Sequence, residues 1–279
     1  MAAYTVVFVV QGEGRGHLSQ ALAMKELMAE MDISIEAIFL GKSNQRKAIP
    51  EYFLKAFEGL ITEFVSPNFL HDKDGKGIKV AESLLLSAIN LPKYIVTSIK
   101  LAKQVNRLNS DFVINFYEPL IGLSQLFTSL RMPLIGIAHQ YLSIHPKFDL
   151  PPKPAFDKNG LKTLSFISQI GSTLNLALSF YPFKDYPSRK IKVVPPLLRN
   201  RLSSLEVENE DFYLVYILNA GYAKDVIEFN MAYPNVKMEC FWDDYSKPSP
   251  YQASSSLTFY HLSDVLFLEK LAKCLILDL

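Results

Sequence analysis

Residues 4–22 read YTVVFVVQGEGRGHLSQAL, an apolar run that leads into a glycine-rich loop and then into a helical pattern. The run at 5–10 is too short for a membrane span and is typical of a buried parallel strand. Gly12, Gly14 and Gly16 follow it, and we expect Gly14 or Gly16 to occupy a place that excludes a Cβ atom. From His17 onward, apolar residues recur at helical spacing. Free backbone N–H groups and the positive end of a helix therefore meet in one place, which favours an anion.

Two familiar phosphate-binding motifs do not fit this loop. The dinucleotide fingerprint needs G-x-G-x-x-G and an acidic residue near the end of the second strand. Here the spacing is G-x-G-x-G, and the second predicted strand ends in Gly41-Lys42-Ser43 without an acid. Lys42-Ser43 is similar to the end of a Walker motif, but Glu36 occupies the position of its first glycine. A tight turn that binds no ligand stays the alternative interpretation.

The composition is that of a globular protein with sizeable cores. The 279 residues suggest about two domains at roughly 150 residues each, and 49% of the residues are hydrophobic. A formal net charge of +1 gives no global field that would attract nucleic acid or an anionic membrane. Cys240 and Cys274 lie in apolar sequence, which is typical of reduced core residues and not of a disulfide framework or a metal site.

The sequence shows neither a secretory signal pattern nor an apolar run of about 18 residues. We therefore expect a soluble, cytoplasmic protein without a nucleic-acid partner. Peripheral contact with the inner face of the membrane is left open by this composition.

Strand and helix patterns alternate along the first two thirds of the chain. Strands are predicted at 4–10, 33–40, 60–65, 111–116, 132–138, 174–180 and 191–194. Helices are predicted at 17–31, 44–57, 78–108 with a break at Pro92, 118–130 and 160–172. Strands without polar alternation indicate an α/β fold with a parallel sheet covered on both faces. In such sheets ligands bind beyond the carboxyl ends of the strands.

The pattern changes at about residue 195 and restarts after 211. A strand at 212–218, a helix at 223–232 and a strand at 235–241 follow, and we expect exposed loops at 139–159 and 243–256. This organisation predicts a Rossmann-like N-terminal domain at 1–195, a linker at 196–211 and a partial second Rossmann-like domain at 212–279.

Several stretches together resemble one family. GEGRGHLSQALA at 12–23, with His17 entering the helix, resembles the N-terminal loop of GT-B glycosyltransferases. The resemblance is strongest to the group that contains the peptidoglycan N-acetylglucosaminyltransferase and the UDP-glycosyltransferases. Weaker matches follow at DFVINFYEPL (111–120), IAHQ (137–140), VVPPLLR (193–199) and within 259–274. The resemblance thus runs along nearly the whole chain.

This resemblance implies transfer of a sugar from a nucleotide-diphosphate donor to a glycan, a lipid-linked sugar or a small molecule, without a metal or other cofactor. The family carries a glycine turn and an acidic helix for the donor after the last segment seen here. We therefore expect a truncated donor-side domain and weak or absent transfer by this chain. The alternatives are a non-catalytic module that binds a sugar or a partner, and a nucleotide-sugar epimerase.

His17 and Glu118 are the candidate catalytic residues. In many members of the resembling family, a histidine at the position of His17 removes the proton of the acceptor hydroxyl. A helix N-terminus disfavours imidazolium, so the ring should be neutral and basic near pH 7. Related enzymes often pair this histidine with an aspartate, but residues 115–117 are Asn-Phe-Tyr. Glu118 could replace that partner, or it could simply stabilise the helix start before Pro119.

The remaining candidates are ligand-binding residues. The loop and the first turn of the helix offer amides, a guanidinium and a hydroxyl to phosphate or sugar. A His-Gln pair ends a later strand, and a glycine opens a helix in the second domain. These candidates are Gly12, Gly14, Arg15, Gly16, Ser19, His139, Gln140 and Gly221.

Overall fold

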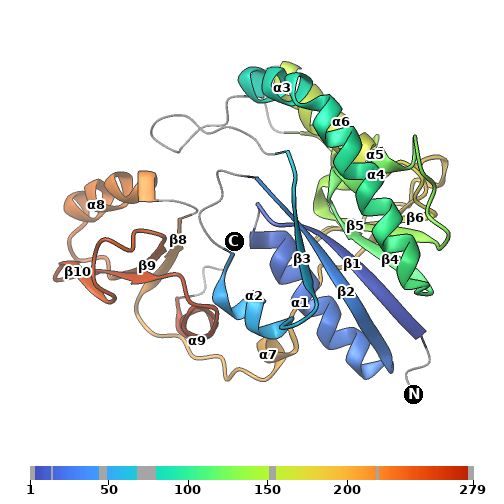
Figure 1. Ribbon diagram of the computed structural model, residues 1–279. Helices are drawn as coiled ribbons and strands as arrows, with labels where there is room; N and C mark the ends of the chain where they lie inside the picture. Colours follow the sequence, from blue (N-terminus) through green and yellow to red (C-terminus); the bar gives the residue numbers. More distant parts are fainter. Residues whose placement is uncertain are drawn as a thin grey trace. The chain divides into compact units, whose positions relative to one another are not determined.

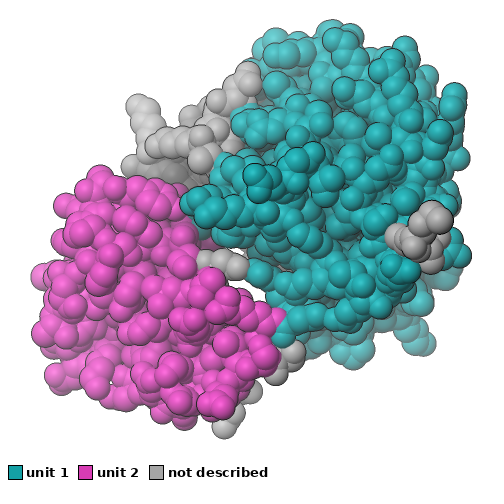
Figure 2. Space-filling view, turned by 60° about the horizontal axis from the view of Figure 1, so that its bottom comes forward, with its two compact units in different colours: residues 1–69, 80–200 teal, residues 70–79, 201–279 magenta. Residues whose placement is uncertain are grey.

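The computed structural model describes residues 4–13, 15–43, 49–67, 80–150, 155–217 and 220–275. The chain forms two compact units, shown in different colours in Figure 2. The first contains residues 1–69 and 80–200, and the second contains residues 70–79 and 201–279. The division at 200/201 lies within the segment 196–211 that the sequence analysis assigns to a linker; the functional domain boundaries stay a prediction.

A parallel sheet forms the centre of the first unit (Figure 1). Its seven strands are β1 (Tyr4–Gln11), β2 (Ile33–Lys42), β3 (Ile61–Val65), β4 (Phe112–Phe116), β5 (Leu134–Ala138), β6 (Leu174–Leu178) and β7 (Ile191–Val194). They lie in the order β3-β2-β1-β4-β5-β6-β7, and every neighbouring pair is parallel. The strand order reverses between β1 and β4, which is where open α/β sheets bind ligands.

Helices cover both faces of this sheet, as predicted. The helices of this unit are α1 (Arg15–Glu30), α2 (Glu51–Ala56), α3 (Val80–Ile89), α4 (Leu91–Leu108), α5 (Pro119–Ser124) and α6 (Ala155–Ser168), with the 3₁₀ helices η1 (His139–Ile144) and η2 (Pro187–Arg189). Helix α7 (Asn200–Ser203) begins at the boundary between the two units. Figure 1 shows α1 and α2 on one face and α4 and α5 on the other.

Strand β1 explains why both faces need cover. Residues 6–10 are all completely buried. Because side chains alternate along a strand, Val6 and Phe8 pack with Leu18 of α1, whereas Val7 and Val9 pack against α4 and α5. The unbroken apolar run at the start of the chain therefore specifies the middle of a two-faced sheet, and the predicted α/β fold class is confirmed.

The second unit contains a smaller mixed sheet. Its strands are β8 (Tyr213–Tyr216), β9 (Met238–Trp242), β10 (Tyr251–Ser254) and β11 (Leu257–His261), in the order β10-β11-β9-β8. Strands β8, β9 and β11 are parallel, and β10 pairs antiparallel with β11. The helices η3 (Ala220–Tyr222), α8 (Ala223–Ala232) and α9 (Asp264–Lys273) complete the described part of this unit.

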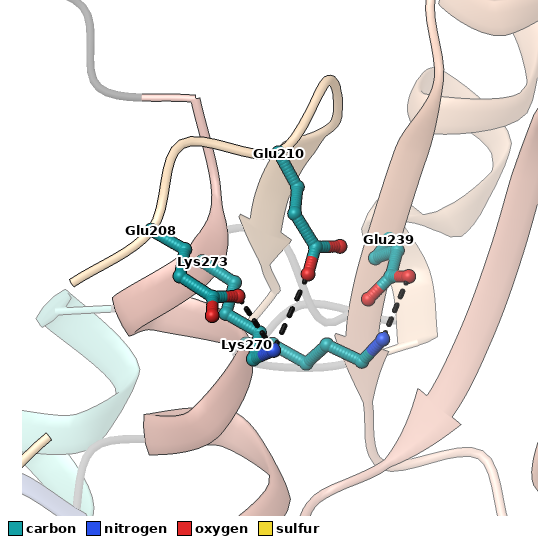
Figure 3. A network of polar contacts seen from close by, with 5 residues as sticks. All are labelled: Glu208, Glu210, Glu239, Lys270 and Lys273. Carbon is teal, nitrogen blue, oxygen red and sulfur yellow. Dashed lines mark hydrogen bonds and ion pairs between the residues drawn. The ribbon is translucent and has the colours of Figure 1, made fainter. Parts of the chain in front are cut away.

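Ion pairs attach α9 to its surroundings in the second unit (Figure 3). Lys273 Nζ lies 2.7 Å from Glu208 Oε2 and 3.3 Å from Glu210 Oε1, both in the segment before β8. Lys270 Nζ lies 2.9 Å from Glu239 Oε1 of β9. The Lys273 pairs are solvent-exposed and contribute little to stability, whereas the Lys270 pair is partly shielded from water.

The predicted break of the helix 78–108 near Pro92 is confirmed: α3 ends at Ile89, α4 begins at Leu91, and Pro92 lies in the first turn of α4, where a missing N–H is tolerated. Two other local predictions are corrected by the structure. The predicted loop 139–159 contains η1, whose Tyr141 is completely buried, and the start of α6. The predicted loop 243–256 contains β10, whose Tyr251 ring stacks on Trp242 at 5.8 Å.

Both cysteines are free, and Cys240 is buried in the core of the second unit. Within the described ranges, no helix combines the length and the apolar character needed to cross a bilayer.

Candidate functional site

The glycine loop after β1 joins two strand ends. The Gly12 amide donates to the Gly41 carbonyl oxygen at 2.7 Å, and a Cβ atom on Gly12 would lie 2.7 Å from that oxygen. Gly12 therefore permits close approach of the two backbones. Gly14 lies outside the described residues. Gly16 is exposed in the first turn of α1, and a Cβ there would meet nothing within 4 Å. The protein itself thus leaves room for a Cβ at 16, and the expectation that Gly14 or Gly16 excludes one stays a prediction.

His17 is buried at the start of α1, with 5% of its surface exposed. Its Nε2 lies 3.2 Å from the side-chain nitrogen of Gln140. The ring of His17 stacks on Tyr117 with a centroid separation of 5.4 Å and on His139 with a separation of 6.2 Å. The side-chain nitrogen of Gln20 lies 3.4 Å from His139 Nδ1. The carboxyl ends of β1, β4 and β5 therefore bring together residues that are more than 100 positions apart, including the predicted His17, His139 and Gln140.

Burial controls the charge of these rings. Desolvation, and after it the neighbouring His139, lowers the pKa of His17 to about 4, while a smaller effect of the Gln20 side chain acts in the opposite direction. Burial also lowers the pKa of His139, although part of that residue is exposed. His17 is consequently a neutral imidazole at pH 7, which is the protonation state that can accept a proton.

Several buried polar atoms in this group have no hydrogen-bond partner among the described residues. They are His17 Nδ1, Gln20 Oε1 and Gln140 Oε1. Leaving such atoms unpaired in the interior costs about 1–3 kcal/mol each. This cluster at the strand-order reversal is therefore a place where a polar ligand has hydrogen bonds to gain.

Glu118 is completely buried and has a different set of contacts. It is the N-cap of α5, and its Oε1 accepts from the Leu120 amide at 3.0 Å. The Ser66 hydroxyl lies 2.7 Å from Oε1 and 2.9 Å from Oε2. Among the described residues, no hydrogen bond joins Glu118 to His17. The structure thus gives Glu118 the helix-capping role that the sequence offered as its alternative and does not pair it with the histidine.

The surroundings of Glu118 favour its neutral form. Burial raises the pKa of Glu118 to about 8, although hydrogen bonds from Leu120 and Ser66 lower it. A Cβ atom on Gly41 would lie far inside contact distance of the Glu118 carboxyl group. Gly41 is therefore a residue that the sequence reasoning missed, although its position at the end of the second predicted strand was a signal for close approach.

Tyr117 and Gln20 are the other residues that the sequence reasoning missed. Tyr117 has φ of 61°, an uncommon backbone conformation for a residue other than glycine, and this turn directs its ring onto His17. Gln20 lies three residues after His17 and thus on the same face of α1, a spacing that could have revealed it.

The remaining predicted ligand-binding residues are Arg15, Ser19 and Gly221. Arg15 and Ser19 are half-buried residues in the first turns of α1, and Gly221 is exposed in η3 of the second unit. Their roles as ligand-binding residues stay predictions. Within the described ranges no group of three His, Cys, Asp or Glu residues could hold a metal ion.

The family of the chain follows from comparison with known proteins. The model of the family described as glycosyl transferase family 1 matches residues 4–277. The chain belongs to glycosyl transferase family 1. No curated protein matches this family member in sequence.

Solved structures with the same architecture include plant UDP-glycosyltransferases. UGT2 of Phytolacca americana, complexed with UDP-2fluoro-glucose and pterostilbene, has a TM-score of 0.53 and 11% identity; the match covers 95% of this chain and 73% of that chain. UGT89C1 of Arabidopsis thaliana, complexed with UDP, has a TM-score of 0.51 and 13% identity, with 95% and 72% covered. A UDP-glucosyltransferase of Polygonum tinctorium gives 0.53 and 12%, with 93% and 71% covered.

At such low identity these similarities establish the fold and not the substrate. They agree with the family match, and the predicted GT-B glycosyltransferase fold is confirmed.

Proposed function

We propose that this glycosyl transferase family 1 protein transfers a sugar from a nucleotide-diphosphate donor to a hydroxyl group, with His17 as the general base. The observation that carries the proposal is the buried, neutral imidazole at the start of α1, beside the reversal of strand order and among unpaired polar atoms. At pH 7 this neutral ring has a lone pair with which it can accept a proton from a bound hydroxyl.

The reaction needs three changes of bonding. A ring nitrogen of His17 accepts the proton of the acceptor hydroxyl as the oxygen attacks the anomeric carbon of the donor. The bond from that carbon to the diphosphate oxygen breaks, and the electron pair leaves with the nucleoside diphosphate. Positive potential stabilises the departing charge, and Arg15 with the N-terminal amides of α1 would supply part of it.

The structural neighbours indicate which substrates to test first. One is complexed with UDP, and another is complexed with UDP-2fluoro-glucose and pterostilbene. We therefore infer that the donor is a nucleotide sugar, with UDP-sugars as the first candidates, and that the acceptor carries a hydroxyl on an aromatic, glycan or lipid-linked group. His139 and Gln140 lie beside His17 and would contact the acceptor.

The test is transfer by the purified chain from UDP- and GDP-sugars to a panel of such acceptors, together with calorimetric titration of each donor. A positioned general base contributes roughly 10²–10⁴-fold to rate, so His17→Ala should lower kcat by that amount while donor affinity changes little. Lys224→Ala, an exposed change on α8, is the matched control. Transfer that survives His17→Ala would contradict the assigned base, and absence of both donor binding and transfer across the panel would overturn the function.

We also propose peripheral membrane contact through α4. Its eighteen residues contain no Asp or Glu. Four exposed cationic side chains project from this helix, and none forms an ion pair with another described residue: Lys93, Lys100, Lys103 and Arg107. Ile89, Leu91 and Val96 are exposed at the α3–α4 end of the same surface. Cationic groups beside exposed apolar groups fit an anionic lipid surface.

Vesicle sedimentation tests this contact. Each basic residue near an anionic surface contributes about 1 kcal/mol, so Lys100→Gln with Lys103→Gln should lower partitioning to phosphatidylglycerol vesicles roughly thirtyfold. Lys224→Gln with Lys237→Gln makes the same charge change in the second unit and should have no such effect. Equal binding to vesicles of neutral phosphatidylcholine, or equal loss in both variants, would contradict the proposed surface.

A further inference from the structure

The His17 ring is fixed in its plane by its neighbours. Tyr117 stacks on it with an interplanar angle of 19° and His139 with an angle of 8°. These contacts restrict tilting of the ring, but they do not distinguish its two nitrogen atoms. Only a hydrogen bond in the plane of the ring can select which nitrogen carries the proton.

That in-plane contact comes from an amide. Gln140 places its side-chain nitrogen 3.2 Å from His17 Nε2. An amide nitrogen is a donor only, so with the amide in this orientation the contact favours a lone pair on Nε2 and the proton on Nδ1. Nδ1 has no partner of good hydrogen-bond geometry among the described residues.

We propose that Gln140 is a positioning residue that keeps the lone pair of His17 on Nε2. In the resting protein the Gln140 amide donates a hydrogen bond to Nε2. During the reaction the acceptor hydroxyl takes the place of this amide and donates to the same atom. This inference rests on the proposed function, because it assigns a role to Gln140 through the base His17. Gln140 is half-buried at the first turn of η1. Its side chain can therefore leave Nε2 when the acceptor hydroxyl arrives.

An amide suits this role better than a carboxylate does. A carboxylate can only accept a hydrogen bond, so at this place it would hold a proton on Nε2 and block the lone pair. It would also favour imidazolium by its charge. The other titratable groups that face the ring are His139 from η1 and Tyr117 from the turn between β4 and α5, and neither is an anion at neutral pH.

Substitution of Gln140 by an acid of the same shape tests the proposal. The protein is labelled with ¹⁵N-histidine, and the two ring nitrogens of His17 are observed by long-range ¹H–¹⁵N correlation; His17→Asn identifies its signals among the five histidines. The native protein should show the proton on Nδ1. Gln140→Glu should move it to Nε2 and raise the pKa of His17 by roughly one to three pH units, the usual effect of an adjacent opposite charge. Gln140→Leu should give a mixture of both tautomers.

Kinetics give the second readout. Gln140→Glu should lower kcat roughly 10- to 100-fold, as loss of an orienting partner commonly does, and should introduce a new acidic limb in the pH profile of kcat. Gln104→Glu makes the same chemical change on the exposed side of α4 and should alter neither readout. An unchanged His17 tautomer in both Gln140 variants would overturn the proposal. Because the spectra need no turnover, they test Gln140 even if the transfer reaction is not found, so the two failures are distinguishable.

Discussion

The regions around His17 and Glu118 are built from neighbouring strand ends, yet they satisfy their polar atoms in opposite ways. Both side chains are buried, and both follow strands of the same parallel sheet. Both oxygens of Glu118 lie within hydrogen-bond distance of the single Ser66 hydroxyl, and Oε1 also accepts from the Leu120 amide. One ring nitrogen of His17 and amide oxygens beside it have no partner among the described residues.

The difference separates a structural group from a reactive one better than burial does. A buried acid with all its acceptors in use stabilises the turn that contains it, and a ligand would have to break those bonds. A buried base with an unpaired polar atom beside it can still form hydrogen bonds with a ligand. Both side chains have strongly displaced pKa values, so the pKa alone would have assigned catalytic roles to both.

The largest expected contrast is in the rate of transfer. Glu118→Gln keeps the shape and the cap, so kcat should stay within about threefold of the native value, far from the roughly 10²–10⁴-fold loss typical of removing a general base. The measurement is kcat at pH 7 for this variant and for His17→Ala with one donor and one acceptor. A loss in Glu118→Gln as large as that in His17→Ala would break the comparison and return Glu118 to the catalytic group.

The next contrast is in stability. Glu118→Ala removes the cap of α5 and leaves Ser66 without its buried partner, which together should cost about 2–4 kcal/mol in the free energy of unfolding. Glu118→Gln should lose far less, because its amide oxygen can still accept from Leu120. Urea unfolding measures the free energy of unfolding of both variants. If Glu118→Ala and Glu118→Gln are equally stable, hydrogen bonds accepted by the side chain at position 118 do not stabilise the fold.

The two regions should also give opposite pH dependences of stability. The pKa of His17 falls to about 4 in the folded chain, below its ordinary 6.5, so its contribution is complete above pH 6.5 and is lost as the pH falls towards 4. The pKa of Glu118 rises to about 8 from 4.5, so its contribution is complete below pH 4.5 and is lost as the pH rises towards 8.

Each slope should disappear in the matching variant. His17→Asn should remove about 3 kcal/mol of acid destabilisation, and Glu118→Gln should remove a loss of about 4 kcal/mol on the alkaline side. Unfolding titrations between pH 4 and 8 measure both. If either variant keeps the native slope, the titration of that group does not control stability.

The smallest expected effect concerns the glycine beside each side chain. Gly16→Ala adds a Cβ that meets nothing within 4 Å in the first turn of α1, so it should raise stability by up to about 1 kcal/mol through helix propensity. Gly41→Ala would press on Glu118 and should destabilise the first unit. Thermal unfolding checks both, and a large loss of ligand affinity in Gly16→Ala at unchanged stability would show that a ligand approaches this backbone closely.

Sequence patterns predicted the strands of the first unit well because burial on two faces of a sheet leaves a recognisable apolar run, and they also predicted the helix at 223–232. The run at 5–10 is completely buried in its central residues. Predicting the helix start at His17 also placed the key imidazole. Glu118 before Pro119 carried the signature of a cap, and capping is the role the structure shows.

The remainder of the site depends on distances that no local pattern encodes. The Tyr117 ring reaches His17 because the backbone at Tyr117 adopts a left-handed conformation. A tyrosine in the sequence does not predict that conformation. Gln140 reaches His17 because β5 lies beside β4 and not elsewhere in the sheet. Likewise, Tyr251 of β10 stacks on Trp242. The polar, proline-containing sequence at 243–256 does not predict that contact.

The order of strands in the sheet also determines when the site can form during folding. Gln140 and His17 are 123 positions apart, and Gln20 and His139 are 119 apart. Contacts across such separations form only after long loops have closed, and the entropy of closure delays them. On a ribosome, the imidazole would leave the exit tunnel long before its amide partner is synthesised. We therefore expect the ring of His17 to acquire its fixed orientation among the last events in folding of the first unit, after β1, β4 and β5 have aligned.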